Sequence, residues 1–206
     1  MRHSNRPGRR GNSALEFAFV GMILVPMFLG TVNIGMNLGR SVQVQQLARD
    51  AGHLYVRQLD FSLAKNKHFL ARMGQGLGLQ VGSGPGVVIL TKIQMIGQDE
   101  CQLGTGSNNC ANKDRAVIVQ RLVVGSSALK QSVFGSPNPA LVLPNGTINS
   151  SDYTTDPTVI TTGFTDVLKN MAKGEVAYLT EVYFEFPEWF MNQGYTSKGV
   201  YARSIF

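Results

Sequence analysis

The sequence predicts an α+β fold in which a long N-terminal helix, half of it in a membrane, packs on a small antiparallel sheet. Residues 17–39 form an apolar run of 23 residues without a charge. A helical pattern with one apolar face follows that run directly, and short segments rich in Val and Ile come later in the chain. These observations place a transmembrane and amphipathic helix ahead of a small antiparallel sheet of about four strands.

Composition and charge exclude some classes of protein. The 206 residues are 43% hydrophobic and 16% charged, which excludes a disordered chain. The formal charge of +6 would ordinarily suggest an anionic partner such as nucleic acid. Four of these positive charges are arginines within the first eleven residues, which leaves +2 on the rest of the chain. Because the other basic residues are spread singly among acids, we expect no nucleic-acid partner.

The apolar run is long enough to span a bilayer. A hydrocarbon core of about 30 Å needs about 20 helical residues, whereas a secretory signal has a shorter apolar stretch with a small-residue cleavage site behind it. No A-x-A motif follows residues 17–39. The four arginines ahead of the run place the N-terminus in the cytoplasm and the rest of the chain outside, by the positive-inside rule. We therefore expect a single-pass protein.

Glu16 is a carboxylate beside this apolar run, where an ionised group needs a partner. It could lie at the interface and reach the headgroups or Arg10. Alternatively, cleavage after Gly11 would make Asn12 the first residue and Glu16 the fifth, one helical turn from a new α-ammonium group. Such a carboxylate could neutralise the free amine of a neighbouring helix in lipid, where an unpaired charge is costly.

These residues resemble a known family. Arg9-Arg10-Gly11 followed by NSALEF looks like the leader and cleavage site of the TadE-like pseudopilins, relatives of type IV prepilins in tight-adherence (Flp) pilus systems. The resemblance covers residues 9–59, and residues 175–206 resemble the last two strands of that family loosely. It implies a minor pseudopilin that a prepilin peptidase cleaves between Gly11 and Asn12, and that enters or primes a pilus fibre used in cell adhesion.

The resemblance also implies partners, a location and a division of the chain. The partners are other pilin or pseudopilin subunits, the prepilin peptidase and the lipid of the inner membrane. The N-terminus would be cytoplasmic, and the C-terminal domain periplasmic or part of the extracellular pilus. The expected parts are a basic leader (1–11), a transmembrane helix (12–39), an amphipathic helical region with a Gly-rich linker (40–85) and an exported sheet domain (86–206).

Small residues give the span a candidate packing face. Ala14 and Ala18 form one small-xxx-small pair, and Gly35 and Gly39 form a GxxxG motif that lets helices approach closely in lipid. The alternative is that glycines are simply common in membrane helices. Pro26 removes one backbone hydrogen bond, and this can kink or locally melt the helix.

Beyond the span, apolar residues at three- and four-residue spacing predict that the helix continues outward with one packed face. They are Val44, Leu47, Ala48, Ala51, Leu54, Tyr55 and Leu59. Four charged residues fall off this stripe and would face water or a partner: Arg40, Arg49, Asp50 and Arg57. Residues 60–73 predict a shorter helix, and the glycine-rich residues 74–86 a linker or turn.

Residues 86–97 and 115–125 are rich in Val and Ile and bounded by Gly, which predicts two strands of an antiparallel hairpin. Cys101 and Cys110 lie between them, on the exported and oxidising side of the predicted topology, and are placed to form a disulfide. Closing this short loop would contribute about 2–3 kcal/mol. A metal site is the weaker alternative, because metal sites favour C-x2-C spacing and further Cys or His nearby.

The last third of the chain mixes loops and strands. Residues 135–158 have the Pro, Asn, Ser and Thr content of an exposed loop, where Asp152 and Asp156 could offer oxygens to Ca²⁺ but are more commonly part of Asx-turns. Residues 164–174 predict a short helix that Asp166 caps. Residues 175–186 alternate as a half-buried strand with Glu181 and Glu185 on its outer face, Pro187 ends it, residues 188–194 cross over, and residues 200–206 form a final strand.

Motifs of catalysis are missing from the sequence. It has no G-x-S-x-G, no Gly-Lys dipeptide and no H-E-x-x-H, and its histidines lie in the leader (His3) or on predicted helical surfaces (His53, His68). We expect no enzyme, no cofactor and no metal. Two other hypotheses remain open, an uncleaved, signal-anchored periplasmic adaptor and a membrane-tethered periplasmic hydrolase whose site is assembled in space.

Overall fold

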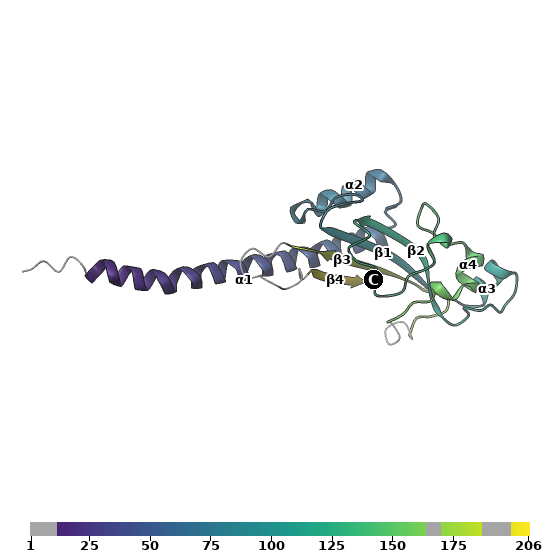
Figure 1. Ribbon diagram of the computed structural model, residues 1–206. Coiled ribbons are helices and arrows are strands. Elements are labelled where there is room, and N and C mark those ends of the chain that lie inside the picture. The colour runs from purple at the N-terminus through teal and green to yellow at the C-terminus, as the bar shows by residue number, and fades with distance from the viewer. Residues whose placement is uncertain (1–11, 164–169, 187–198) are drawn as a thin grey trace, which may run out of the picture.

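The computed structural model describes residues 12–163, 170–186 and 199–206. A single helix, α1 (Asn12–Val56), stands free at its N-terminal end and lies against a sheet at its other end (Figure 1). The sheet has four strands in the order β2-β1-β3-β4, and all neighbours are antiparallel. The predicted α+β class is confirmed. The predicted leader, the helix that Asp166 would cap and the crossover at 188–194 lie wholly or mainly outside the described residues.

The two predicted strands of the hairpin are neighbours in the sheet, with β2 at its edge and β1 inside it. β1 (Gly86–Met95) pairs with β2 (Ala116–Gly125), with a bulge between Lys92 and Ile93. The other edge of β1 pairs with β3 (Val176–Phe184), which pairs in turn with β4 (Val200–Ile205). The Val- and Ile-rich strand β1 is therefore buried in the middle of the sheet, as a continuous apolar run requires.

The C-terminal half of α1 covers one face of this sheet. Its predicted apolar stripe lies in the core with side chains from all four strands, among them Leu90, Leu122 and Val182. α2 (Ala64–Met73) folds back along α1, and the 3-10 turn η1 (Gln75–Leu77) follows it. Leu77 and Leu79, from the glycine-rich segment, are buried in the same core. Residues 44–79 and the sheet therefore share one hydrophobic core.

Phe206 packs against the C-terminal end of α1. The Phe206 ring lies against Gly52, where an added Cβ would be 2.2 Å from Phe206 Cε2. The ring centroids of Phe206 and His53 are 4.6 Å apart, and the Phe206 backbone exchanges two hydrogen bonds with Tyr178. Gly52 thus has a packing role inside this chain, because a larger residue would displace the aromatic ring.

The second face of the sheet is also covered, which differs from the half-buried strand predicted for β3. Glu181 lies on the predicted outer face, yet it is only 2% exposed. Its carboxylate accepts hydrogen bonds from Ser132 Oγ, from Val133 N (3.1 Å) and from Tyr201 Oη (2.8 Å). A segment after β2 therefore crosses this face, and its donors allow a carboxylate to be buried there.

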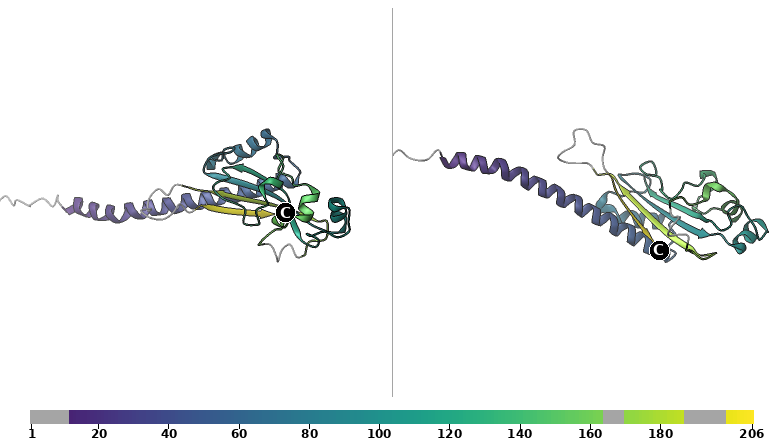
Figure 2. Two further views of the ribbon diagram at one scale, coloured as in Figure 1. Left: turned by 45° about the vertical axis from the view of Figure 1, so that its right-hand side comes forward. Right: turned by 90° about the horizontal axis from the view of Figure 1, so that it is seen from below.

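The distal end of the domain has a small core of its own. α3 (Gln98–Thr105), the 3-10 turns η2 (Pro139–Leu141) and η3 (Pro157–Val159), and α4 (Ser150–Thr155) gather there, far from the free half of α1 (Figures 1 and 2). The prediction of a simple exposed loop over residues 135–158 was wrong, because Ile148 and Tyr153 are buried. The side chain of buried Asn112, which lies ahead of β2, holds α4 in place by donating hydrogen bonds to the carbonyls of Tyr153 (3.0 Å) and Asp156 (2.7 Å).

The two candidate ion ligands of this region, Asp152 and Asp156, accept hydrogen bonds from neighbouring residues. Asp156 accepts hydrogen bonds from Thr158 N (2.7 Å) and Thr158 Oγ1 (2.6 Å), which lowers the pKa of its carboxyl group. This is the Asx-type turn that sequence reasoning favoured. Asp152 accepts a hydrogen bond from Ser151 Oγ at 3.4 Å. Among the residues that the structure describes, no group of three or more His, Cys, Asp or Glu side chains could hold a metal.

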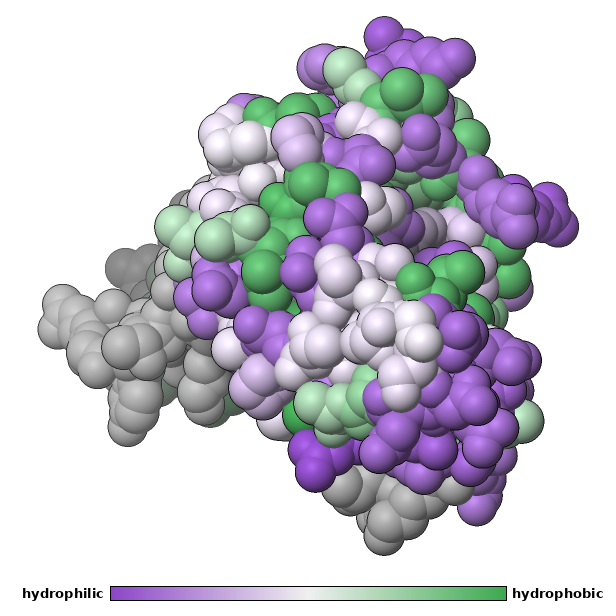
Figure 3. All heavy atoms as spheres, turned by 90° about the vertical axis from the view of Figure 1, so that its right-hand side faces the viewer, coloured by the Kyte–Doolittle hydropathy of each residue, from purple (hydrophilic) through white to green (hydrophobic). Residues whose placement is uncertain are grey.

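Viewed from the distal end, the surface mixes hydrophilic side chains with separate hydrophobic patches (Figure 3). Leu103 of α3 is the most exposed large apolar side chain here, at 74%. Single exposed apolar residues are normal on a protein surface and indicate no ligand by themselves.

The disulfide that the sequence predicted joins Cys101 of α3 to Cys110, with their Cα atoms 5.3 Å apart. We expect the Cys101→Ser, Cys110→Ser double variant to lose about 2–3 kcal/mol of unfolding free energy, because the unfolded chain regains the freedom of the open loop. Urea denaturation of the detergent-solubilised chain measures this. An oxidised chain that already contains free thiols, or a double variant as stable as the parent, would contradict the bond and its contribution.

Candidate membrane and assembly helix

The N-terminal half of α1 presents apolar side chains on all sides. Residues 13–39 are mostly exposed, and Phe17 reaches 80%. Among the described residues, α1 is the one helix long and apolar enough to cross a membrane, and none of its most apolar window is buried. At about 1.5 Å per residue, the free half is longer than the roughly 30 Å hydrocarbon core of a bilayer. Such a surface is stable only in lipid or against other helices.

Glu16 lies in the first turns of this exposed helix. Its side chain is exposed and forms no hydrogen bond or ion pair with any described residue. It is one helical turn from Asn12, the residue at which α1 begins. Because none of the described residues binds the carboxylate, the structure fits both interpretations of Glu16, contact with the headgroups or Arg10 and contact with the amine of a neighbouring chain.

The small residues of the span have no packing partner inside the described chain. A Cβ added at Gly21, Gly30, Gly35 or Gly39 would meet nothing within 4 Å, whereas one at Gly52 would overlap Phe206. Ala14 and Ala18 are exposed as well. Contacts within this domain therefore give no reason for these residues to be small. Close packing of a second helix on this surface remains a prediction.

Pro26 does not interrupt α1. The helix runs without a break from Asn12 to Val56 with Pro26 inside it, so the local melting considered from the sequence is absent. A proline within a helix leaves the carbonyl four residues earlier without its N–H partner, here that of Met22. The surrounding turns keep their own hydrogen bonds, and these are enough to hold the helix together.

The first charge after the span is held by the sheet domain. Sequence reasoning placed Arg40 toward water or a partner, but its guanidinium lies 4.9 Å from the ring centroid of Phe186, and the residue is half-buried. Phe186 follows β3, and its ring stacks on the buried ring of Phe184 at 6.0 Å. Arg40 thereby connects the end of the apolar span to the sheet. Arg49, Asp50 and Arg57 are exposed, as expected.

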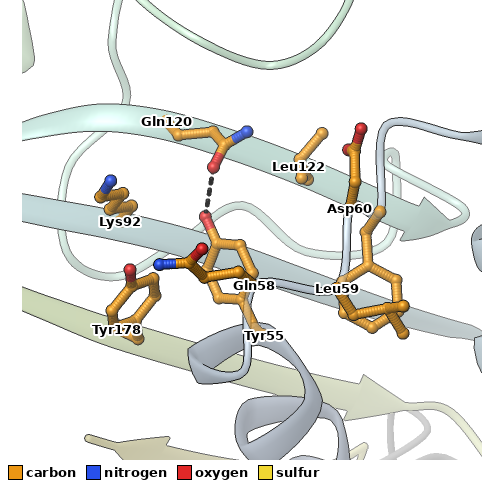
Figure 4. A pocket seen from close by; sticks show the side chains of 9 residues that line it. Tyr55, Gln58, Leu59, Asp60, Lys92, Gln120, Leu122 and Tyr178 are labelled. Atoms are coloured by element: carbon orange, nitrogen blue, oxygen red, sulfur yellow. Dashed lines mark hydrogen bonds between the residues drawn. The ribbon is translucent and has the colours of Figure 1, made fainter.

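A cleft of about 290 Å³ lies between the C-terminal end of α1 and the sheet (Figure 4). Tyr55 Oη donates a hydrogen bond to Gln120 Oε1 at 2.9 Å, and Lys92 Nζ lies 5.9 Å from the ring centroid of Tyr178. Burial raises the pKa of Tyr55, so its hydroxyl stays a neutral donor. These groups can pack and form hydrogen bonds, but they include no nucleophile paired with a base. Sequence reasoning missed this cleft, because its residues are far apart in the chain.

The two histidines of the described chain do not form a catalytic group. His53 packs on Phe206. His68 lines an open groove beside α2 with Arg72 and Ser83, and the residues that line this groove include no acid. A triad needs a nucleophile, a base and an orienting group in mutual contact, and the described residues around His53 and His68 do not provide one.

Comparison with known protein families gives a match that covers most of α1. Residues 11–53 match the family model of TadE-like proteins. The resemblance seen in the sequence is confirmed for this segment, about a fifth of the chain, which begins at Gly11 and covers nearly all of α1. The TadE-like segment indicates involvement in a tight-adherence pilus and interaction with other pilus components. Comparison with curated proteins found no match, and comparison with solved structures found none either.

Proposed function

We propose that this chain is a minor pseudopilin of a tight-adherence pilus, inserted in the inner membrane and cleaved by a prepilin peptidase after Gly11. One observation carries the proposal. The TadE-like match covers α1, and the free half of this helix presents an apolar surface that its own domain leaves uncovered. A helix of this kind can leave the lipid only if other apolar helices replace the lipid around it.

Each part of the N-terminal region has a physical role in this proposal. The four leader arginines orient insertion with the N-terminus in the cytoplasm. Gly11 offers the peptidase a small residue at the membrane face, and cleavage there creates a free amine on Asn12. Glu16 of one subunit then neutralises the amine of an adjacent subunit. The sheet domain stays outside, attached to the C-terminal half of α1.

The location of the mature chain separates this proposal from an uncleaved periplasmic adaptor. In cells that carry the whole pilus system, we expect fibres sheared from the surface to contain this chain or to disappear when it is deleted. Immunoblots of the sheared and membrane fractions measure both results. A chain confined to membranes of cells whose fibres form normally without it would contradict the pseudopilin role and favour the adaptor.

A further inference from the structure

The end of the sheet next to the free half of α1 combines cations with aromatic rings. We call it the membrane-proximal rim, and it consists of Arg40, Lys130, Tyr183, Glu185, Phe186 and Tyr201. Arg40 contacts Phe186 on the face that α1 covers. On the other face, Lys130 Nζ lies 5.6 Å from the ring centroid of Tyr183 and 5.9 Å from that of Tyr201. Both faces of the sheet thus end in a cation beside aromatic rings.

The path of the chain places the rim at the end of the apolar span. Arg40 follows Gly39, the last residue of the uncharged run, and α1 is continuous across this point (Figure 1). No hinge in α1 separates the span from the domain, because Val44, four residues after Arg40, is already buried in the core. With α1 in a bilayer, Arg40 and Phe186 therefore lie in the headgroup layer, which is about 5–7 Å thick on each side.

The tyrosines of the rim lie within reach of the same layer. Tyr183 is three residues before Phe186, or about 10 Å along an extended chain. Tyr183 Oη donates to Glu185 Oε1 at 3.2 Å, so its ring leans toward the end of the strand. Tyr201 pairs with Tyr183 across β3 and β4. The two tyrosines are partly exposed, which leaves ring surface free for contact.

The two rim cations have no acidic partner in the part of the chain that the structure describes. At the distal end, by contrast, Lys173 Nζ lies 2.7 Å from Asp114 Oδ1. The rim is therefore more positive than negative, with Glu185 as its one acid among the six residues. Tyrosine and lysine or arginine together are typical of the water–lipid interface, where rings lie at headgroup level and cations reach phosphates.

We propose that the membrane-proximal rim docks the sheet domain on the headgroups of the outward-facing leaflet, with Arg40 and Lys130 contacting the phosphates of anionic lipids. This inference rests on the proposed membrane insertion of α1. Docking orients the domain on the bilayer before the subunit leaves it. The rim must then be released when the helix is transferred to a fibre.

Site-specific fluorescence on the full chain tests the docking. A nitrobenzoxadiazole dye is placed at Ser83→Cys beside the rim, at Thr155→Cys on the distal end, or at Ile23→Cys in the span. Ser83 is exposed, and the Glu185 N–H binds the carbonyl of nearby Pro85 at 2.8 Å. The labelled chains are reconstituted in vesicles of phosphatidylcholine, alone or with an equal amount of phosphatidylglycerol, each containing a lipid with a quencher near its headgroup.

We expect strong quenching at position 83 in the anionic vesicles, less in phosphatidylcholine alone, and little at position 155. Arg40→Gln and Lys130→Gln should each lower the docked fraction about fivefold at low occupancy, whereas Lys65→Gln on α2, a matched loss of charge away from the rim, should not. Equal quenching at positions 83 and 155 while position 23 is buried in lipid would overturn the docking and leave the insertion intact. Loss of lipid contact at position 23 would instead refute the insertion itself. If a charge variant folds poorly, the test still stands on the chains with native Arg40 and Lys130, whose quenching at position 83 is compared between the two lipid compositions.

Discussion

Replacing Glu16 with alanine should abolish pilus assembly and leave membrane insertion unchanged. In the proposed assembly, this carboxylate neutralises the α-amine of Asn12 on an adjacent helix in a medium of low dielectric constant. Without it, a buried ammonium group has no partner, and incorporation loses several kcal/mol. We expect pilus output, measured as sheared fibre protein, to fall by at least about tenfold, because each 1.4 kcal/mol changes an equilibrium tenfold.

Two control variants separate charge from other effects of that substitution. Glu16→Asp keeps the negative charge on a shorter side chain and should retain part of the output. Ser13→Ala changes an exposed polar residue one turn away and should retain nearly all of it. Membrane fractions show whether each variant inserts. Normal fibre output from an inserted Glu16→Ala chain would refute the pairing of Glu16 with the amine.

Removal of the buried carboxylate on β3 should destabilise the sheet domain strongly. In Glu181→Ala, the hydroxyl of Tyr201 and the N–H of Val133 lose a buried acceptor. Arg121 also loses a nearby negative charge, and its guanidinium already has a pKa lowered by burial. Unsatisfied buried donors and an uncompensated charge together cost about 3 kcal/mol or more. For a domain of this size, we expect the melting temperature to fall by about 6–12 °C.

The matched control is Asp50→Ala, which removes an exposed carboxylate from α1 and should shift the melting temperature very little. The melting temperature of Glu181→Gln should fall between those of the two variants. The amide keeps one acceptor oxygen, but its NH₂ group faces other hydrogen-bond donors. Near-UV circular dichroism of the chain in detergent follows the sheet domain separately from the lipid-exposed helix. A Glu181→Ala chain with the same melting temperature as the parent would contradict the structural role of this carboxylate.

Period and composition were sufficient to predict the elements with strong local patterns. The apolar stripe from Val44 to Tyr55 predicted the packed half of α1, because residues three and four apart share one face of a helix. Runs of β-branched residues between glycines predicted β1 and β2. Cys101 and Cys110 could be paired because a loop between adjacent strands keeps its two ends close together.

The second face of the sheet and the distal core could not be predicted in the same way. The segment that buries Glu181 has no periodicity, and alternation along β3 gives the side of each residue but not what covers that side. Residues 135–158 contribute their few apolar side chains at irregular spacing, so Ile148 and Tyr153 resembled loop residues. Burial at these sites depends on long-range contacts such as those of Asn112, which local patterns do not encode.

In the candidate site, too, local sequence patterns predicted some residues, whereas contacts between distant residues could not be predicted. Glu16 could be identified as a carboxylate beside an apolar run, and the glycines as small residues within that run. The structure places all of them on an exposed helix surface. Their predicted partners belong to other chains, so contacts within one chain do not display them. The sequence did not predict the Arg40–Phe186 contact, because the two residues are far apart in the chain. The Phe186 ring is held in place by stacking on Phe184.

In the proposed function, the peptidase converts this chain into a mature subunit that begins at Asn12. The most direct test is the intact mass of the protein extracted from membranes of a host that has the prepilin peptidase, with N-terminal sequencing of the same sample. We predict a chain that has lost residues 1–11 and begins Asn-Ser-Ala-Leu-Glu-Phe. A chain that still begins at Met1 or Arg2 in that host would contradict the claim.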